Sequence, residues 1–355
     1  MKAEESPLAQ RSPIFKNACC PYSGALAMQK FLSRAFSLLG LVVFLAALWV
    51  LRIKLHQLHW SDVTAAMGHL TALQIAAALF FVCLSYFTVS LYDVLALRSM
   101  RIKLHPLRIM LTGFICHTLS HNVGLSSLTG GSMRYRLYKA NGVTGKEVVR
   151  IISFNLLTFW LGLLTVAGLV FFIAAPQLPS FFGLPFSSAQ PIGMLFLLIL
   201  CAYLLWSMHH RALRIWKWTI PIPSIHLSLA QMLVGGADWI IGSLILYSLL
   251  PHTGGVTFGL VLRSFLIAQI AGLTSQAPAG LGVFETIILN VLPSTLPESV
   301  ILGALLMYRM IYNVIPLIIA AILLAIREIT THRRHFSHAA THWGRWLGGH
   351  AKEKK

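Results

Sequence analysis

IISFNLLTFWLGLLTVAGLVFFIA, residues 151–174, is the stretch that decides the fold, because it contains no charged side chain. As an α-helix rising about 1.5 Å per residue, it would reach about 36 Å, enough to cross the roughly 30 Å hydrocarbon core of a bilayer. Further apolar stretches of comparable character occupy residues 35–51, 72–97, 191–207, 226–250 and 300–326. Nearly all of the chain lies in or beside these stretches, so we predict an all-α polytopic membrane protein.

The composition supports this fold class and excludes an ordinary soluble protein. Of 355 residues, 57% are apolar and 11% are charged, whereas a soluble domain carries about 25% charged residues. The 28 Lys and Arg against 10 Asp and Glu give a net charge of +18, a balance that would also suit a nucleic-acid-binding protein. Most of the basic residues flank the apolar stretches, however. The charge therefore indicates orientation in a membrane and contact with anionic lipid, with no nucleic acid as partner.

The distribution of Lys and Arg predicts how the chain crosses the membrane, because cytoplasmic loops are the basic ones. Residues 175–190, 251–256 and 293–299 contain no Lys or Arg, and the basic clusters occupy residues 1–34, 98–108, 134–150, 211–217 and 327–355. Placing these clusters on one side requires residues 109–129 to enter and leave from the cytoplasm. Residues 257–292 then begin and end outside, either as a re-entrant dip or as two short crossings.

We therefore predict about six full transmembrane helices plus two broken or re-entrant segments, with both termini in the cytoplasm. The alternative is seven or eight full spans that break the charge rule locally. The expected organisation is a basic N-terminal tail (1–34), an integral membrane domain (35–326) and a basic C-terminal tail (327–355). Opposed interrupted segments are typical of transporters with inverted repeats, where they mark the substrate site, so an inverted pseudo-repeat is one interpretation.

The sequence GGSMRYRLY, residues 130–138, is a candidate binding site for a lipid headgroup. Gly130 and Gly131 permit a tight turn that would break a helix. The guanidinium group of an arginine can bind two phosphate oxygens at once, and tyrosine favours the headgroup level of a membrane. The candidate ligands are Arg134, Tyr135, Arg136 and Tyr138. The alternative is a basic loop that only sets orientation.

The sequence SQAPAGLGVFE, residues 275–285, interrupts the second broken segment. Pro278, Gly280 and Gly282 predict a break in the helix, and Glu285 follows in an otherwise apolar region. A carboxylate at membrane depth is costly, so it usually has a partner or a function. The alternative is a structural kink in which Glu285 binds backbone donors freed by the break.

The last span carries an arginine within MYRMIYNVIP, residues 307–316. An arginine at this depth requires a carboxylate, and Glu285 is the nearest in sequence to Arg309, with Asp238 and Asp93 as the other candidates. A buried structural ion pair and a transporter gate are both consistent with such a pairing. The further intramembrane groups that we assign to gating are Tyr312, Asp238 and Arg263.

Motifs for enzymatic chemistry are missing from the sequence, which has no P-loop, no HExxH and no GxSxG. We predict no cofactor, no metal site, no catalytic residue and no ATPase. The five cysteines have no disulfide or metal spacing. A membrane-embedded enzyme or assembly partner acting on lipid headgroups stays open as an alternative, with Ser126, Ser127 and His121 as weak candidates.

Four motifs in order make the chain resemble a known family: GGSMRYRLY (130–138), RIISFNLLTFWLG (150–162), PAGLGVFE (278–285) and YRMIYNVIP (308–316). The chain is similar, over roughly residues 30–330, to the bacterial flippase-like family formed by the transmembrane region of lysylphosphatidylglycerol synthetase, the multiple peptide resistance factor. It looks most like the stand-alone inner-membrane members of Gram-negative bacteria.

This resemblance implies an inner-membrane protein that moves an anionic or aminoacylated phospholipid between leaflets. It also implies that Arg134, Arg136, Glu285 and Arg309 fall on family motif positions. The chain stops soon after its last span, so the aminoacyl-transferase domain and lysyl transfer are not expected. Anionic phospholipids are the expected partners, and a homo-oligomer is left open.

Overall fold

The computed structural model describes residues 70–327 apart from 123–125, 179–186, 210–211, 216–217, 222, 253–254, 276–279 and 293–295, together with a few isolated residues on either side. The predicted N-terminal tail and the predicted span 35–51 lie outside the described residues, as does nearly all of the C-terminal tail.

Six described helices are long and apolar enough to cross a membrane. They are α3 (Ala72–Ser99), α6 (Gly145–Ala174), α7 (Gln190–His209), α8 (Ile225–Leu249), α9 (Phe258–Ser275) and the helix Glu298–Arg327 that begins with α11. Five coincide with predicted full spans, and α9 is the first half of the second predicted broken segment. The polytopic α-helical fold class is therefore confirmed.

Local sequence explains where two of the long helices, α3 and α6, begin. At α3, the Thr71 side chain accepts a hydrogen bond from the backbone N–H of Gln74, and the Gln74 side chain accepts one from the Thr71 backbone. Thr144 and Glu147 form the same capping box at the start of α6. Such boxes satisfy backbone N–H groups that a helix start otherwise leaves unpaired.

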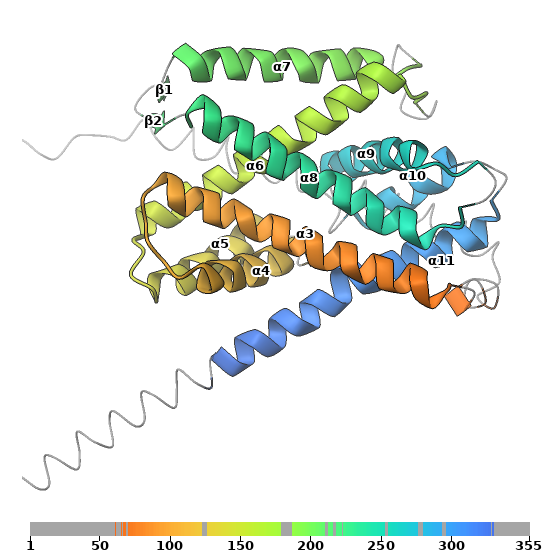
Figure 1. Cartoon of the computed structure of the whole chain (residues 1–355), viewed down its shortest axis with the longest axis horizontal. Helices are drawn as coiled ribbons and strands as arrows, with labels where there is room; N and C mark the ends of the chain where they lie inside the picture. Colours follow the sequence, from red (N-terminus) through yellow and green to blue (C-terminus); the bar gives the residue numbers. More distant parts are fainter. Residues whose placement is uncertain are drawn as a thin grey trace, which may run out of the picture.

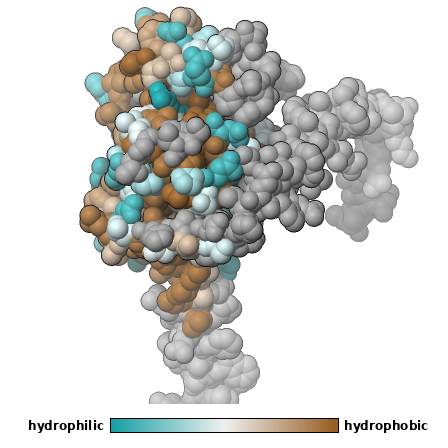
Figure 2. All heavy atoms as spheres, turned by 90° about the vertical axis from the view of Figure 1, so that its right-hand side faces the viewer, coloured by the Kyte–Doolittle hydropathy of each residue, from teal (hydrophilic) through white to brown (hydrophobic). Residues whose placement is uncertain are grey.

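The basic and uncharged connections lie at opposite ends of the molecule (Figure 1). The left-hand end carries the α3–α4 and α5–α6 connections and the two strands, whereas the α6–α7, α8–α9 and α10–α11 connections lie at the right-hand end. Figure 2 faces the right-hand end and shows hydrophilic and hydrophobic residues mixed there. The last helix projects downward and is brown, and its exposed residues include Ile315, Ile318 and Ile322.

The first broken segment is a helical hairpin that enters from the basic end. It consists of α4 (Pro106–Asn122) and α5 (Ser126–Lys139), which pack against each other and meet near the middle of the molecule (Figure 1). At about 1.5 Å per residue these helices are about 26 and 21 Å long, shorter than the bilayer core. Both connections to the rest of the chain lie at the same end.

The break between α4 and α5 does not lie at Gly130 and Gly131, where it was predicted. Gly130 and Gly131 lie inside α5, and the break falls between Asn122 and Ser126. A glycine permits a turn but does not require one. Packing does not require glycine at Gly131 either, because a Cβ there would lie 3.6 Å from the Ile152 side chain on α6, an ordinary van der Waals distance.

The second hairpin, α9 and α10 (Val283–Val291), lies at the opposite end of the molecule (Figure 1). The two helices pack against each other, and α10, with 9 residues, is about 14 Å long and cannot cross a bilayer. Gly280 and Gly282 have φ values of +64° and +79°, which disfavour any residue with a Cβ. Pro278 lies outside the described residues.

The same order of elements, a hairpin between two long helices, occurs in each half of the chain, and the two halves run in opposite directions. In the first half, the hairpin α4–α5 separates the long helices α3 and α6, and in the second half, α9–α10 separates α8 from the helix Glu298–Arg327. The two hairpins enter from opposite ends, and α3 and α8 pack together (Figure 1). Helix α7 lies outside this arrangement and packs mainly on α6.

The described residues also include elements other than α-helix. A turn of π-helix, η3 (Met310–Val314), follows α11 (Glu298–Arg309) before the helix continues to Arg327. Two short antiparallel strands, β1 (Ala212–Ile215) and β2 (Trp218–Pro221), form a hairpin between α7 and α8. The sequence analysis predicted no strands, and this pair lies in a basic connection outside the membrane spans.

Candidate functional site

A fully buried carboxylate, Asp93 on α3, ties the first hairpin to two long helices. Its Oδ1 atom lies 3.1 Å from Nη2 of Arg134 on α5, and its Oδ2 atom accepts a 2.7 Å hydrogen bond from the Tyr138 hydroxyl. Asn155 on α6 donates to Oδ1 from its side-chain amide. The side chains of Arg134 and Asp93 are 11% and 0% exposed, so this is a buried ion pair.

This pair separates the four residues that were predicted to bind a headgroup. Arg134 and Tyr138 lie on one face of α5, four residues apart, and both contact Asp93. Tyr135 and Arg136 are exposed, and the Lys139 ammonium lies 5.3 Å from the Tyr135 ring. The helical conformation of this segment, which was predicted as a loop, therefore divides the four residues between two faces.

The second hairpin has an ion pair of its own, between Glu285 on α10 and Arg309 on α11. The Oε1 atom of Glu285 lies 2.8 Å from Nη2 and 2.9 Å from Nε of Arg309. Its Oε2 atom accepts a 2.7 Å hydrogen bond from the backbone N–H of Gly282. Glu285 therefore caps α10 and pairs with Arg309 at the same time. Of the three carboxylates considered for Arg309, the structure brings Glu285 to it.

Asp238 on α8 lies apart from both ion pairs and contacts α3. Its Oδ1 atom accepts a 2.9 Å hydrogen bond from the Ser85 hydroxyl, and its Oδ2 atom accepts a 3.1 Å bond from the Tyr92 hydroxyl. Ser85 and Tyr92 are seven residues apart and lie on one face of α3. This spacing of polar residues inside an apolar span is the sequence signal that could have located them.

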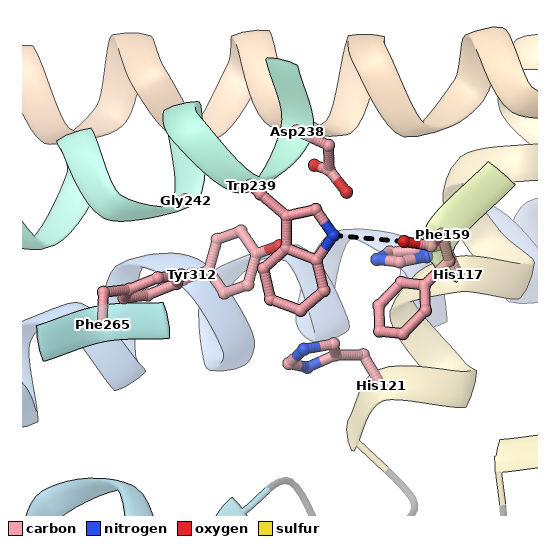
Figure 3. Close-up of a pocket in the computed structure, with 8 residues that line it drawn as sticks. All are labelled: His117, His121, Phe159, Asp238, Trp239, Gly242, Phe265 and Tyr312. Atoms are coloured by element: carbon pink, nitrogen blue, oxygen red, sulfur yellow. Dashed lines mark hydrogen bonds between the residues drawn. The ribbon is translucent and has the colours of Figure 1, made fainter. Parts of the chain in front are cut away.

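A small cavity of about 40 Å³ lies where the two halves meet (Figure 3). It is lined by residues of α4, α6, α8, α9 and η3: His117, His121, Phe159, Asp238, Trp239, Gly242, Phe265 and Tyr312. The His117 and His121 rings lie 5.8 Å apart, and the His121 and Tyr312 rings lie 5.6 Å apart. The cavity can hold water but is far smaller than the pockets of about 300–1,000 Å³ that bind organic ligands.

The π-helical turn places Tyr312 at this cavity. Its backbone carbonyl accepts a 3.0 Å hydrogen bond from the Tyr86 hydroxyl on α3, and its own hydroxyl lies 3.5 Å from Ser85 Oγ. Single π-helical turns inside α-helices occur frequently at functional sites. No feature of the sequence marked Tyr86 or the π-turn in advance, because both depend on packing between distant spans.

Arg263 does not join this site. It lies in the second turn of α9, about 8 Å from the start of the helix, and is half-buried. The side chains of Ser126 and Ser127 lie outside the part of the structure that is described, and His121, the third candidate of the enzyme alternative, lines the cavity. The described site thus consists of two buried ion pairs, one on each hairpin, with Asp238 and the cavity between the halves.

Sequence comparison places this architecture in a family. No family model matches the chain. An uncharacterized Synechocystis protein is 37% identical over 309 residues, which cover 87% of this chain and 96% of that protein. The inner membrane protein YbhN of Escherichia coli is 31% identical over 298 residues, which cover 83% of this chain and 92% of YbhN. The chain belongs to the YbhN family.

The YbhN family chain is also similar to part of a larger enzyme. The phosphatidylglycerol lysyltransferase of Staphylococcus haemolyticus is 27% identical over 251 residues, which cover 70% of this chain but 28% of that enzyme. The match is to the membrane region and not to the synthetase domain. The family resemblance predicted from the four sequence motifs is therefore confirmed.

Proposed function

We propose that this YbhN family protein moves an anionic or modified phospholipid between the leaflets of a bacterial inner membrane, without an ATPase of its own. The observation that carries the proposal is the pair of hairpins that enter from opposite ends, each tied to a neighbouring span by a buried ion pair. Interrupted helices of opposed direction are how many transporters build a substrate site. The similarity to a phosphatidylglycerol lysyltransferase supports phospholipid as the substrate class.

The two ion pairs suit exchange of a carboxylate for a phosphate. Arg134 and Arg309 each contact an acidic side chain through guanidinium N–H groups, and a lipid phosphate offers oxygens of similar geometry. Separating a buried pair costs about 3–5 kcal/mol because one charge is left uncompensated. A phosphate that takes the place of the carboxylate would offset much of this cost. Lipid binding would thereby release the hairpin from its neighbouring span.

The described conformation is a closed state under this proposal. The central cavity has room for water but not for a phosphorylated headgroup. Headgroup passage therefore requires movement of at least one hairpin. Each hairpin contains at least one helix too short to cross the bilayer. Each is also joined to the spans at one end, which suits it to this movement.

Proteoliposomes containing the purified protein and a fluorescent phosphatidylglycerol test the proposal. Chemical quenching of the outer leaflet reports exchange, and we expect faster exchange than in empty vesicles. Arg134→Gln should abolish the acceleration, whereas Arg150→Gln, an exposed basic residue at the same end of the molecule, should preserve it. No acceleration across several anionic lipids would overturn the proposal.

The lipid inventory of a deletion strain separates transport from headgroup chemistry. Transport predicts an unchanged set of lipid species with altered exposure between leaflets. A missing or accumulated lipid species would favour the alternative, a membrane-embedded enzyme or assembly partner that acts on headgroups.

A further inference from the structure

Asp238 is the one carboxylate of the described central site that has no basic partner. The ion pairs of the described residues join Asp93 to Arg134 and Glu285 to Arg309, whereas Asp238 accepts hydrogen bonds from the hydroxyls of Ser85 and Tyr92. A charged carboxylate at membrane depth is costly without a compensating charge. Binding a cation is the direct way to remove that cost.

The surroundings of Asp238 can carry a proton to it. Asp238 shares the cavity with His117 and His121, whose side chains project toward the same space (Figure 3). The Nδ1 atom of His121 is buried and has no hydrogen-bond partner among the described residues. Polar as well as aromatic side chains line the cavity, and it has room for at least one water molecule, which could bridge the carboxylate and an imidazole. Imidazole, water and carboxylate are all groups that can pass on a proton.

The other groups that face Asp238 do not supply a fixed positive charge. The titratable side chains around it are Tyr86 and Tyr92 on α3, His117 and His121 on α4, Tyr308 on α11 and Tyr312 on η3. The parts of α6 and α9 at the cavity are Phe159 and Phe265. Arg309, the nearest basic residue on the last helix, is paired with Glu285. Hard metal cations prefer several oxygen ligands, whereas this cavity combines one carboxylate with imidazoles and aromatic rings.

We propose that the cavity is an internal proton-binding site centred on Asp238. An imidazolium of His117 or His121 loses its N–H proton to the cavity water, the water passes a proton to a carboxylate oxygen of Asp238, and the imidazole becomes neutral as an O–H bond forms. The proton comes from bulk water and returns to it. Atoms and charge balance without a further reactant.

Proton binding at Asp238 would act on the contact between the two halves of the protein. The carboxylate accepts hydrogen bonds from two side chains of α3, and α3 and α8 are adjacent helices from opposite halves. A protonated carboxyl group has one donor and weaker acceptors, so its bonds to Ser85 and Tyr92 must rearrange. This coupling to lipid movement rests on the proposed function, but the proton site itself does not.

Infrared difference spectroscopy of the purified protein in lipid nanodiscs tests the site without requiring transport. Acidification should produce the C=O band of a protonated carboxylic acid that is missing in Asp238→Asn. Tyr92→Phe, which removes one hydrogen bond to that group, should shift this band to higher frequency. The matched control is Glu147→Gln, which removes a carboxyl group away from the cavity and keeps a residue suited to the capping box. The band lost in Asp238→Asn should persist in Glu147→Gln.

The outcomes separate the proton site from the transport proposal. A spectrum in which Asp238→Asn removes no carboxylic acid band, or in which that band ignores Tyr92→Phe, would overturn the proton site even if lipid exchange is observed. If the band is present and the vesicles show exchange, an imposed pH gradient should change the rate of exchange for the parent protein and for Glu147→Gln. Loss of this gradient response in Asp238→Asn is the expected result, and an unchanged response would refute the coupling.

Discussion

Breaking the ion pair between Glu285 and Arg309 is the perturbation whose size the structure constrains best. Their side chains are only 10% and 14% exposed, and two guanidinium nitrogens lie within 2.9 Å of one carboxylate oxygen. Glu285→Gln keeps an acceptor for the Gly282 N–H but leaves the arginine without its countercharge. Arg309→Met keeps an apolar stem beside the Phe284 ring, which lies 5.5 Å from the guanidinium. Each substitution should lower the free energy of unfolding by about 3–5 kcal/mol.

The double variant distinguishes a true pair from two independent residues. Independent effects would sum to about 6–10 kcal/mol. The double variant has no buried charge at this position, so we expect it to be no less stable than either single variant. The coupling free energy should therefore be about 3 kcal/mol or more.

Equilibrium unfolding in detergent micelles measures this cycle. The control cycle combines Glu285→Gln with Arg263→Met, which alters a half-buried arginine on α9 outside the pair. Its effects should add to within about 0.5 kcal/mol. Additive effects in the Glu285–Arg309 cycle as well would refute the assignment of a coupled ion pair.

Two further substitutions test the packing around the site. Gly235→Ala should destabilise the protein by about 1–3 kcal/mol, because its Cβ would lie 2.4 Å from a backbone carbonyl oxygen of α6. The control Gly259→Ala, where the Cβ meets open space, should be nearly neutral. Equal melting temperatures for the two variants would contradict the close crossing of α6 and α8. Tyr138→Phe should lower the stability by about 1–3 kcal/mol, because Asp93 loses a hydrogen-bond donor. In the same thermal unfolding assay, the control Tyr135→Phe, at an exposed residue, should have no effect. Equal losses of stability in the two variants would argue against the buried cluster around Asp93.

Much of the fold could be predicted from hydropathy and loop charge, because both follow from the cost of placing polar groups in a bilayer. The reversal of residues 109–129 followed from keeping two basic loops on one side, and the structure has a hairpin there. Glycine was a less reliable guide. Gly280 and Gly282 lie at a break, whereas Gly130 and Gly131 lie in a helix, because a glycine permits a turn without requiring one.

The polar contacts of the site were harder to predict, because most join residues far apart in the sequence. Arg309 and Glu285 were paired in advance because few carboxylates occur near the last span. Arg134 was predicted to bind a lipid headgroup, and its pairing with Asp93 was not foreseen. Hydropathy does not determine how the span that carries Asp93 is rotated about its own axis. The spacing of Ser85 and Tyr92 marks one face of α3, but their shared partner Asp238 follows only from the packing of α8 on α3.

The central claim is that the two hairpins enter from opposite sides and return to their side of entry. Single cysteines in a background without native cysteines, labelled in sealed vesicles by a reagent that does not cross membranes, test it most directly. We expect cysteines at Lys103 and Asn141, which flank the first hairpin, to react from one side. Cysteines at His252 and Pro297, which flank the second, should react from the other. Reaction of Lys103 and Asn141 from opposite sides, or of His252 and Pro297 from opposite sides, would contradict the account.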